Sequence, residues 1–279
     1  MRFINSFVVG LARAALVTPL LAAAQGAPSS PLVLAEGLRS VSPHVQVIPD
    51  GSVPLVPNVG FVVGDKAVLV VDTGLGPRNG AAVAAVAQRL TGGITRKKLY
   101  LVTTHFHPEH DLGAQAFPAD TTMIRSSDQV ADIAEFGLAL AGIFASRSAI
   151  NAELLEGATF RGADLTFNGQ LLLDLGSLQV QLIAAGPNHT RGDTVVWVPA
   201  DHVLFSRDVA MRAQPAFASP YSTASHWLAS LDRLDALKPA VVVPSHGPIG
   251  DAGLIAGYRA YLQEIRSLVA AAKAEGRSR

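Results

Sequence analysis

The side chains best suited to metal chemistry are concentrated in one short segment, residues 104–110 (THFHPEH). Three histidines and one carboxylate fall within six residues, directly after the apolar run 99–102. Alternation along an extended chain would place His105 and His107 on one side, and the following turn would bring Glu109 and His110 to a second point nearby. Imidazole and carboxylate suit a borderline divalent ion, zinc first, with iron or manganese as alternatives. Because a packed strand has no structural use for so many titratable groups, the pattern favours a metal site.

Three further candidates occur downstream in matching settings. His189 lies in the glycine-bounded turn 186–193, after the strand-like run 180–183. Asp208 follows the short apolar run 203–205, and His246 follows the β-branched run 241–243. Every candidate therefore comes after a run that reads as a strand. Open α/β layers place their sites at such carboxyl ends, so these side chains are expected to meet.

Together these elements resemble the metallo-β-lactamase-fold hydrolase superfamily. That family carries an HxHxDH motif, then a histidine in a glycine-bounded turn, an aspartate after a strand and a final histidine before glycine. Each has a counterpart here in the same order. Residues 70–74 (VVDTG) also resemble the family's early aspartate turn, in which Asp72 supports the ligands without binding metal. The resemblance implies an αβ/βα four-layer sandwich: two mixed β-sheets packed face to face, helices outside, and metals at one edge between the sheets.

Carried over residue by residue, the resemblance implies two divalent ions, zinc first, held by seven side chains. The first ion would be bound by His105, His107 and His189. The second ion would be bound by Glu109, His110 and His246, with Asp208 bridging both. Metal-bound hydroxide would then be the nucleophile, since zinc-bound water ionises near pH ~7 instead of near ~16. Ligand histidines also need their other ring nitrogen oriented by outer residues, for which the candidates are Asp72, Thr190 and Asp193.

Glu109 departs from the family pattern, which usually has aspartate at this position. The longer side chain can reach the second metal from a shifted backbone, bind it more weakly, or leave that site partly filled. Pro108 restricts the adjustment of the local backbone. We interpret Glu109 as a ligand because an unpaired buried carboxylate is costly, the alternative being a residue that only rims the site. Asp208 and Glu109 are the candidate catalytic residues.

The elements that position these residues divide the chain into two similar halves. The first half is expected to contain strands at Val45–Ile48, Val59–Val63 and Ala67–Val71, a helix at 79–90, and then the strand of the histidine motif. The second half is expected to contain strands at 165–173, 178–183, Thr194–Val198, 203–205 and 241–243, with helices at 227–237 and 254–273. Strands clustered in each half, with helices between them, favour packed sheets with helices outside.

Two segments are candidates for setting the substrate. Residues 126–155 form an expected helical pair that either packs on the outside of the sandwich or caps the metal edge. The loop 211–221 begins close to Asp208, and it is either a simple structural loop or part of the site. In the second case Arg212 would pair with a substrate carboxylate or phosphate, while Phe217 and Tyr221 would line an apolar wall.

Composition indicates an exported protein with one layered domain. Residues 1–24 read as a secretory signal, with a basic start and an apolar centre, and cleavage is expected near Ala24 or Ala27. The domain is expected to span residues 32–279, in the periplasm or secreted, with no membrane contact after cleavage. There is no cysteine, so every metal ligand must be N or O. The 22 basic and 22 acidic residues balance, and no basic block suggests a nucleic-acid partner. Oligomeric state leaves no signal in the sequence.

The function that follows is an exported binuclear metal-dependent hydrolase acting on a small molecule. The resemblance favours an ester, lactone or thioester, because β-lactamases of the three-histidine type generally lack the bridging aspartate that Asp208 supplies. A β-lactam remains the first alternative, since export suits a role against external compounds. A phosphodiester of nucleic acid is disfavoured by the missing basic face. The alternative from another class is a metal-binding or redox protein that uses this fold without hydrolysis.

Overall fold

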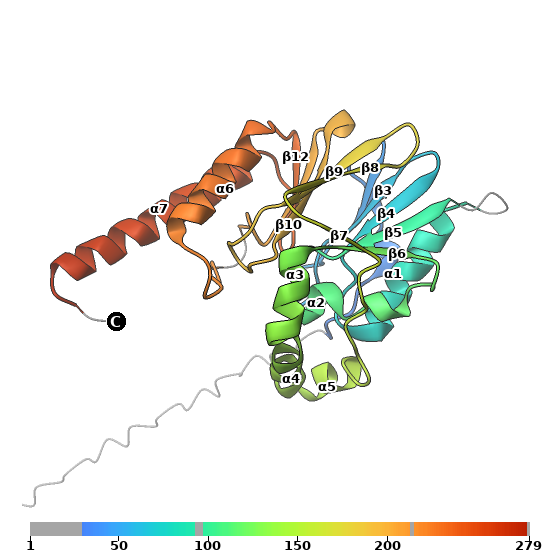
Figure 1. The fold of residues 1–279 in the computed structure, drawn as a ribbon, viewed down its shortest axis with the longest axis horizontal. Helices are drawn as coiled ribbons and strands as arrows, with labels where there is room; N and C mark the ends of the chain where they lie inside the picture. The colour runs from blue at the N-terminus through green and yellow to red at the C-terminus, as the bar shows by residue number, and fades with distance from the viewer. Residues whose placement is uncertain (1–29, 93–96, 213–214, 278–279) are drawn as a thin grey trace, which may run out of the picture.

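The computed structural model describes residues 30–92, 97–212 and 215–277, so the expected secretory signal lies outside the described residues. Two β-sheets pack face to face, and helices cover their outer faces (Figure 1). This arrangement confirms the four-layer αβ/βα sandwich expected from the sequence.

The first sheet has seven strands in the order β1 to β7. Its strands are β1 (Arg39–Ser40), β2 (Val45–Ile48), β3 (Val59–Val63), β4 (Ala67–Val71), β5 (Lys98–Val102), β6 (Thr122–Ser126) and β7 (Leu165–Phe167). The pairs from β1 to β4 are antiparallel, whereas β4 to β7 run parallel. All five residues of β4 are buried, as expected for a parallel strand covered on both faces. Helix α1 (Gly76–Leu90) packs on the outer face.

The second sheet has five strands in the order β12, β11, β10, β9, β8. Its strands are β8 (Gln170–Asp174), β9 (Gln179–Ala184), β10 (Thr194–Val198), β11 (Val203–Arg207) and β12 (Val241–Pro244). Only the pair of β11 and β12 is parallel. Helices α6 (Ala224–Ala236) and α7 (Gly253–Ala274) cover its outer face around the buried Trp197 and Trp227.

The prediction of one strand over residues 165–173 is wrong. The segment contains two strands, β7 and β8, which belong to different sheets. Gly169 lies between them with φ +65°, a left-handed conformation that reverses the chain at little cost for glycine. Both flanks are apolar because both face the core between the sheets, so composition alone did not reveal the break.

Residues 127–154 fold into a helical insertion at one end of the sandwich (Figure 1). The insertion comprises α3 (Ser127–Asp132), the π-helix η3 (Ile133–Gly137), α4 (Leu138–Ser146) and α5 (Ala149–Leu154). Within the described residues, the stretch Ser127–Ser146 alone has the length and composition to cross a membrane, and 22% of its most apolar window is buried. The remaining short elements are η1 (Ala35–Gly37), α2 (Pro108–Asp111), η2 (Ala114–Ala116) and η4 (Pro199–Asp201).

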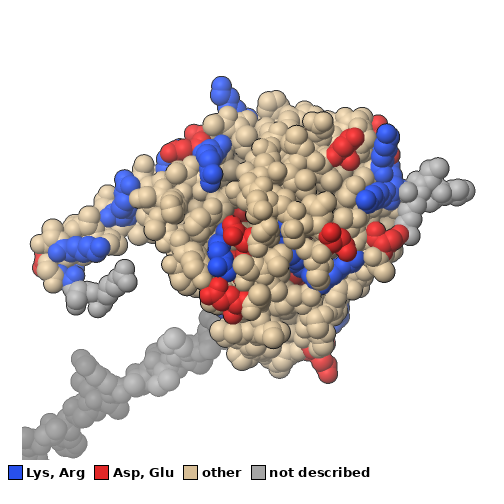
Figure 2. Space-filling model, in the orientation of Figure 1, with Lys and Arg blue, Asp and Glu red and all other residues tan. Residues whose placement is uncertain are grey.

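Charged side chains are sparse on the molecular surface. Figure 2 shows lysine and arginine scattered among aspartate and glutamate, with no continuous basic area on the face drawn. The sequence pattern of balanced charge therefore carries through to this face of the folded molecule.

Candidate metal centre

All seven predicted ligands meet at one edge of the sandwich, and each follows a strand of a sheet. His105 and His107 lie in the bend after β5, and Glu109 and His110 lie on the single turn of α2. The other three ligands come from the second sheet: His189 after β9, Asp208 after β11 and His246 after β12. Because β5 ends at Val102, strand alternation does not bring His105 and His107 together, and the bend does so instead. All seven side chains are buried.

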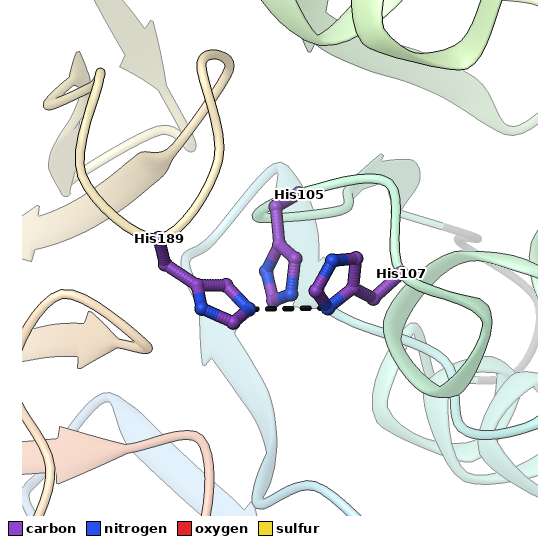
Figure 3. Close-up of side chains that lie close together, drawn as sticks. All are labelled: His105, His107 and His189. Carbon is purple, nitrogen blue, oxygen red and sulfur yellow. Dashed lines mark hydrogen bonds between the residues drawn. The ribbon is translucent and has the colours of Figure 1, made fainter. Parts of the chain in front are cut away.

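Three imidazoles form the first group. His105, His107 and His189 converge from opposite sheets (Figure 3). Their ring centroids are 4.6 Å apart for His105 and His107, 4.8 Å for His105 and His189, and 4.6 Å for His107 and His189. His189 Nε2 lies 3.1 Å from His107 Nδ1. Ring nitrogens directed at one point in this way are the donor set of a three-histidine metal site.

The second group comprises Glu109, His110 and His246, and Asp208 lies between the two groups. Asp208 Oδ2 is 3.4 Å from His189 Nε2 in the first group. Asp208 Oδ1 is 3.7 Å from His110 Nε2 in the second group. One carboxylate therefore directs one oxygen to each group, which is the geometry required of a bridging ligand.

Several donor atoms of this cluster have no partner within the protein. Among the described residues, His105 Nε2, Glu109 Oε2, His110 Nε2 and Asp208 Oδ1 are buried and make no hydrogen bond. Buried polar atoms are almost always partnered, because an unsatisfied one costs free energy. Four such atoms of ligand type, distributed over the two groups and Asp208, fit a pair of divalent cations.

Outer contacts orient three of the imidazoles. His110 Nδ1 donates to Asp72 Oδ2 at 2.7 Å, and His246 Nδ1 donates to the Val56 carbonyl at 2.9 Å. His189 Nδ1 donates to the Phe217 carbonyl at 2.8 Å. Fixing Nδ1 as the donor leaves Nε2 of each ring free to bind a metal. The sequence analysis identified only Asp72 among these partners, since main-chain carbonyls carry no residue signature.

Asp72 is the centre of a buried polar network. Its carboxylate also accepts hydrogen bonds from Thr104 N at 2.7 Å and Thr104 Oγ1 at 3.0 Å. Arg207 Nη2 pairs with the same carboxylate, and Arg207 Nη1 donates to the Asn58 carbonyl at 2.7 Å. Asp72 and Arg207 both have positive φ angles, 68° and 53°, a costly conformation for such residues. The sequence analysis missed Arg207, although a charge at the end of a buried strand beside a ligand was a usable signal.

Thr190 and Asp193 support the loop that carries His189 without contacting its ring. Asp193 Oδ1 accepts hydrogen bonds from Thr190 N at 2.9 Å and Thr190 Oγ1 at 2.6 Å. Asp193 Oδ2 accepts a hydrogen bond from Asn188 N at 3.2 Å. The predicted role of orienting His189 is therefore indirect, because the ring itself is held by the Phe217 carbonyl.

The protonation states favour metal binding near neutral pH. Burial, followed by the neighbouring imidazoles, lowers the pKa of His105 and His107 well below the ordinary value, so both rings are neutral. Burial alone would raise the pKa of Asp208, but His189 and the other nearby histidines outweigh it and hold that pKa far below the usual range. Burial raises the pKa of Glu109. His105 and His107 thus offer neutral nitrogens beside an ionised central carboxylate. Burial alone would lower the pKa of His110, but the neighbouring carboxylates, Asp72 first, outweigh it and raise that pKa.

The three predicted substrate residues separate in space. Phe217 lines the cavity that contains His107, Glu109, Asp208 and His246. Arg212 lines a different cavity, beside Met211, Leu254 and Tyr258. The Tyr221 hydroxyl donates a hydrogen bond to Glu135 Oε1 at 2.7 Å. The Arg191 guanidinium stacks on the Tyr221 ring, with 4.5 Å between its Cζ and the ring centroid. Neither Arg212 nor Tyr221 lines the metal cavity, although Phe217 of the same loop does.

The helical insertion supplies residues that the sequence analysis did not single out as site residues. Leu140, Phe144 and Arg147 line the metal cavity together with the ligands. Of the two interpretations of this segment, the structure therefore favours the cap over the metal edge. Arg147 was missed because its sequence neighbours give no sign that it faces histidines from distant strands.

Comparison with known proteins identifies the family. The model of the Metallo-beta-lactamase superfamily matches residues 53–246. The chain belongs to this superfamily. A metallo-beta-lactamase from Pontibacter korlensis superposes with a TM-score of 0.63 at 21% identity, covering 81% of this chain and 98% of that one.

Alkylsulfatases are also among the similar proteins. A linear primary-alkylsulfatase from a Pseudomonas species is 26% identical over 213 residues, which cover 65% of this chain and 40% of the relative. A stereoselective inverting sec-alkylsulfatase from Pseudomonas superposes with a TM-score of 0.67 at 15% identity, covering 87% of this chain and 44% of that one. This chain thus spans less than half the length of either protein. Superfamily membership and the histidine cluster together indicate a hydrolase that binds divalent metal.

Proposed function

We propose that this protein is a binuclear metal-dependent hydrolase that cleaves an ester, a thioester or a lactone. The observation that carries the proposal is the position of Asp208, whose two oxygens face the two groups of histidines. An aspartate in that place would bind both ions. Zinc is the proposed metal, because the donor set is nitrogen and oxygen with three imidazoles converging at one point.

The residues around the metal centre have different roles in the proposed hydrolysis. Two bound divalent ions supply the acidification of water and the stabilisation of developing negative charge. Asp208 holds its proton too weakly to act as an efficient general base near neutral pH, so its role is to accept a hydrogen bond from the attacking water and orient it. Asp72 holds His110 in position through the 2.7 Å hydrogen bond. Leu55 and Phe144 form apolar walls of the cavity and limit the access of bulk water.

Export to the periplasm or to the medium is the second part of the proposal. It rests on the basic start and apolar centre of residues 1–24. Expression of the full chain in a bacterium, followed by fractionation and N-terminal sequencing, tests it. A mature protein that begins just after Ala24 or Ala27, outside the cytoplasm, supports export, and an intact N-terminus in the cytoplasm contradicts it.

The activity is tested with the zinc-loaded mature protein on a matched panel of carboxylic esters, thioesters, lactones and a chromogenic cephalosporin. Chelator-sensitive turnover of an ester, thioester or lactone with kcat/KM of about 10⁴ M⁻¹s⁻¹ or more is expected. Asp208→Asn should abolish it, whereas Asp232→Asn, which alters an exposed carboxylate on α6, should not. Turnover of the cephalosporin alone would establish the β-lactam alternative. Bound iron without any turnover would favour a non-hydrolytic role.

A sulfate ester is the second candidate substrate. The similarity to the linear primary-alkylsulfatase favours it, since this relative matches over 65% of the chain. Adding an alkyl sulfate to the same panel and measuring released sulfate tests this candidate. Sulfate release faster than carboxylic ester cleavage would make the sulfate ester the primary substrate.

A further inference from the structure

An apolar groove lies directly beside the metal cavity. It has a volume of about 220 Å³, and its apolar lining residues are Phe106, Phe136, Ala139, Leu140, Ile143, Phe217 and Pro220. His107, His189, Leu140 and Phe217 line both the groove and the metal cavity, so the two spaces adjoin. A molecule that reacts at the metals can therefore extend into the groove.

The wall of the groove is built by the helical insertion. Phe136 lies on η3, and Leu140 and Ile143 lie on α4. Ile143 remains 53% exposed within this wall. Surface patches that leave large aliphatic side chains open around a hollow are typical of binding sites for apolar ligands. A π-helical turn is rare and is frequent at functional sites, which agrees with its position here.

Two arginines are near these spaces, and they differ in their partners. Arg191 lines the groove, and its guanidinium already pairs with Asp132 at 3.0 Å and with Glu135 at 2.9 Å. Arg147 lines the metal cavity, and its guanidinium stacks 3.9 Å from the centroid of the Phe144 ring. Among the described residues no carboxylate forms an ion pair with Arg147. An exposed guanidinium at a cavity wall, without a carboxylate partner among the described residues, suits an anionic oxygen group.

We propose that the substrate is a dissolved anionic amphiphile, whose single aliphatic chain lies in the groove while its anionic group pairs with Arg147. The inference rests on the proposed function for the bond that is cleaved, and it adds the chemical class of the substrate. An aliphatic chain fits because aliphatic and aromatic side chains form most of the lining. The small volume suits one chain, whereas a bilayer would require an extended surface.

Binding to the zinc-loaded mature protein tests the groove without any turnover. Calorimetry with butyrate, hexanoate, octanoate and decanoate, each below its aggregation concentration, should show the dissociation constant falling about fourfold per methylene until the groove is filled. Ile143→Asp should weaken octanoate binding by about tenfold or more and flatten the dependence on chain length. Leu138→Asp is the matched control, because Leu138 lies on the same helix, is 84% exposed and does not line the groove.

The role of Arg147 is tested by comparing charged and neutral ligands of equal length. Arg147→Gln should weaken octanoate binding by about tenfold and leave octanol binding unchanged, since only the carboxylate gains a charge-assisted hydrogen bond. Arg78→Gln is the matched control, because Arg78 is exposed and faces Glu153 on α5, 3.6 Å away. Equal losses for octanoate and octanol would remove the assignment of Arg147.

Three results would overturn the inference. The first is an affinity for the carboxylates that does not depend on their chain length. The second is an equal loss of octanoate binding in Ile143→Asp and Leu138→Asp. The third is binding of the protein to phosphatidylcholine vesicles without binding of the dissolved carboxylates. Chain-length-dependent binding in a protein that hydrolyses none of the panel would contradict the proposed function and leave the groove assignment standing. Efficient hydrolysis without chain-length dependence would contradict the groove assignment alone.

Discussion

The substitution Asp72→Asn tests the central claim that a buried network outside the ligands holds the metal centre together. Asparagine keeps the size of the side chain and tolerates the positive φ of 68° at this position, so backbone strain is not the variable. It removes the charge that faces Arg207 and replaces one acceptor oxygen by an NH₂ donor. The contacts affected are those to His110, Thr104 and Arg207.

The expected loss follows from these contacts. Without Asp72 the guanidinium of Arg207, which is 1% exposed, retains only the Asn58 carbonyl as a described hydrogen-bond partner. Leaving one charge of a buried pair uncompensated costs about 3–5 kcal/mol of unfolding free energy. The loss of the His110 contact should also weaken metal binding by roughly 10–100-fold, since the ring is no longer oriented.

The assay separates the two effects. Urea unfolding of the metal-free protein, followed by fluorescence of the buried Trp197 and Trp227, measures stability, and competition with a chromophoric chelator measures zinc affinity. The double variant with Arg207→Met should regain about 2 kcal/mol relative to Asp72→Asn alone, because the unpaired cation is gone. A stability loss below about 1 kcal/mol for Asp72→Asn, with unchanged zinc affinity, would refute the reasoning.

Three further predictions concern other parts of the site and its support. Glu109→Gln should reduce the metal content from two ions to one per chain by elemental analysis, and retention of two ions would show that Glu109 is not a required ligand. Gly80→Ala should cost about 1–3 kcal/mol in urea unfolding, because a Cβ there lies 2.0 Å from the Gly113 carbonyl oxygen, whereas Gly142→Ala, with open space around it, should be neutral or stabilising. Burial raises the pKa of Asp193 from 3.8 to about 6. Since the native pKa lies above the unfolded value, stability present at low pH is lost as pH rises through about 6, by about 3 kcal/mol in total. The metal-free wild type should therefore lose stability relative to Asp193→Asn between about pH 4 and about pH 6, and a difference that stays constant across that range would contradict this assignment.

The sequence was sufficient for the ligand types, their order and most elements of the fold. Strands such as Val59–Val63 and Ala67–Val71 were predicted with their observed bounds, because a buried strand leaves a short apolar run. Helix boundaries were less accurate: α1 begins at Gly76 instead of residue 79, since Pro77 is well placed in the first turn. The ligand histidines could also be predicted from the sequence, because metal binding is a property of the imidazole itself and the strand before each histidine is visible in the neighbouring residues.

Contacts between distant segments could be found only in the folded molecule. Arg207 and Asp72 are separated by 135 positions, and the carbonyl that orients His189 belongs to Phe217, 28 positions away. The structure also placed Arg147 at the metal cavity and Arg212 in another one, although both are exposed arginines. Residue type and spacing specify which groups are available and which element each occupies. Which groups face one another depends on how the two sheets pack and on the path of each loop. Neither produces a periodic pattern in the sequence from which it could be predicted.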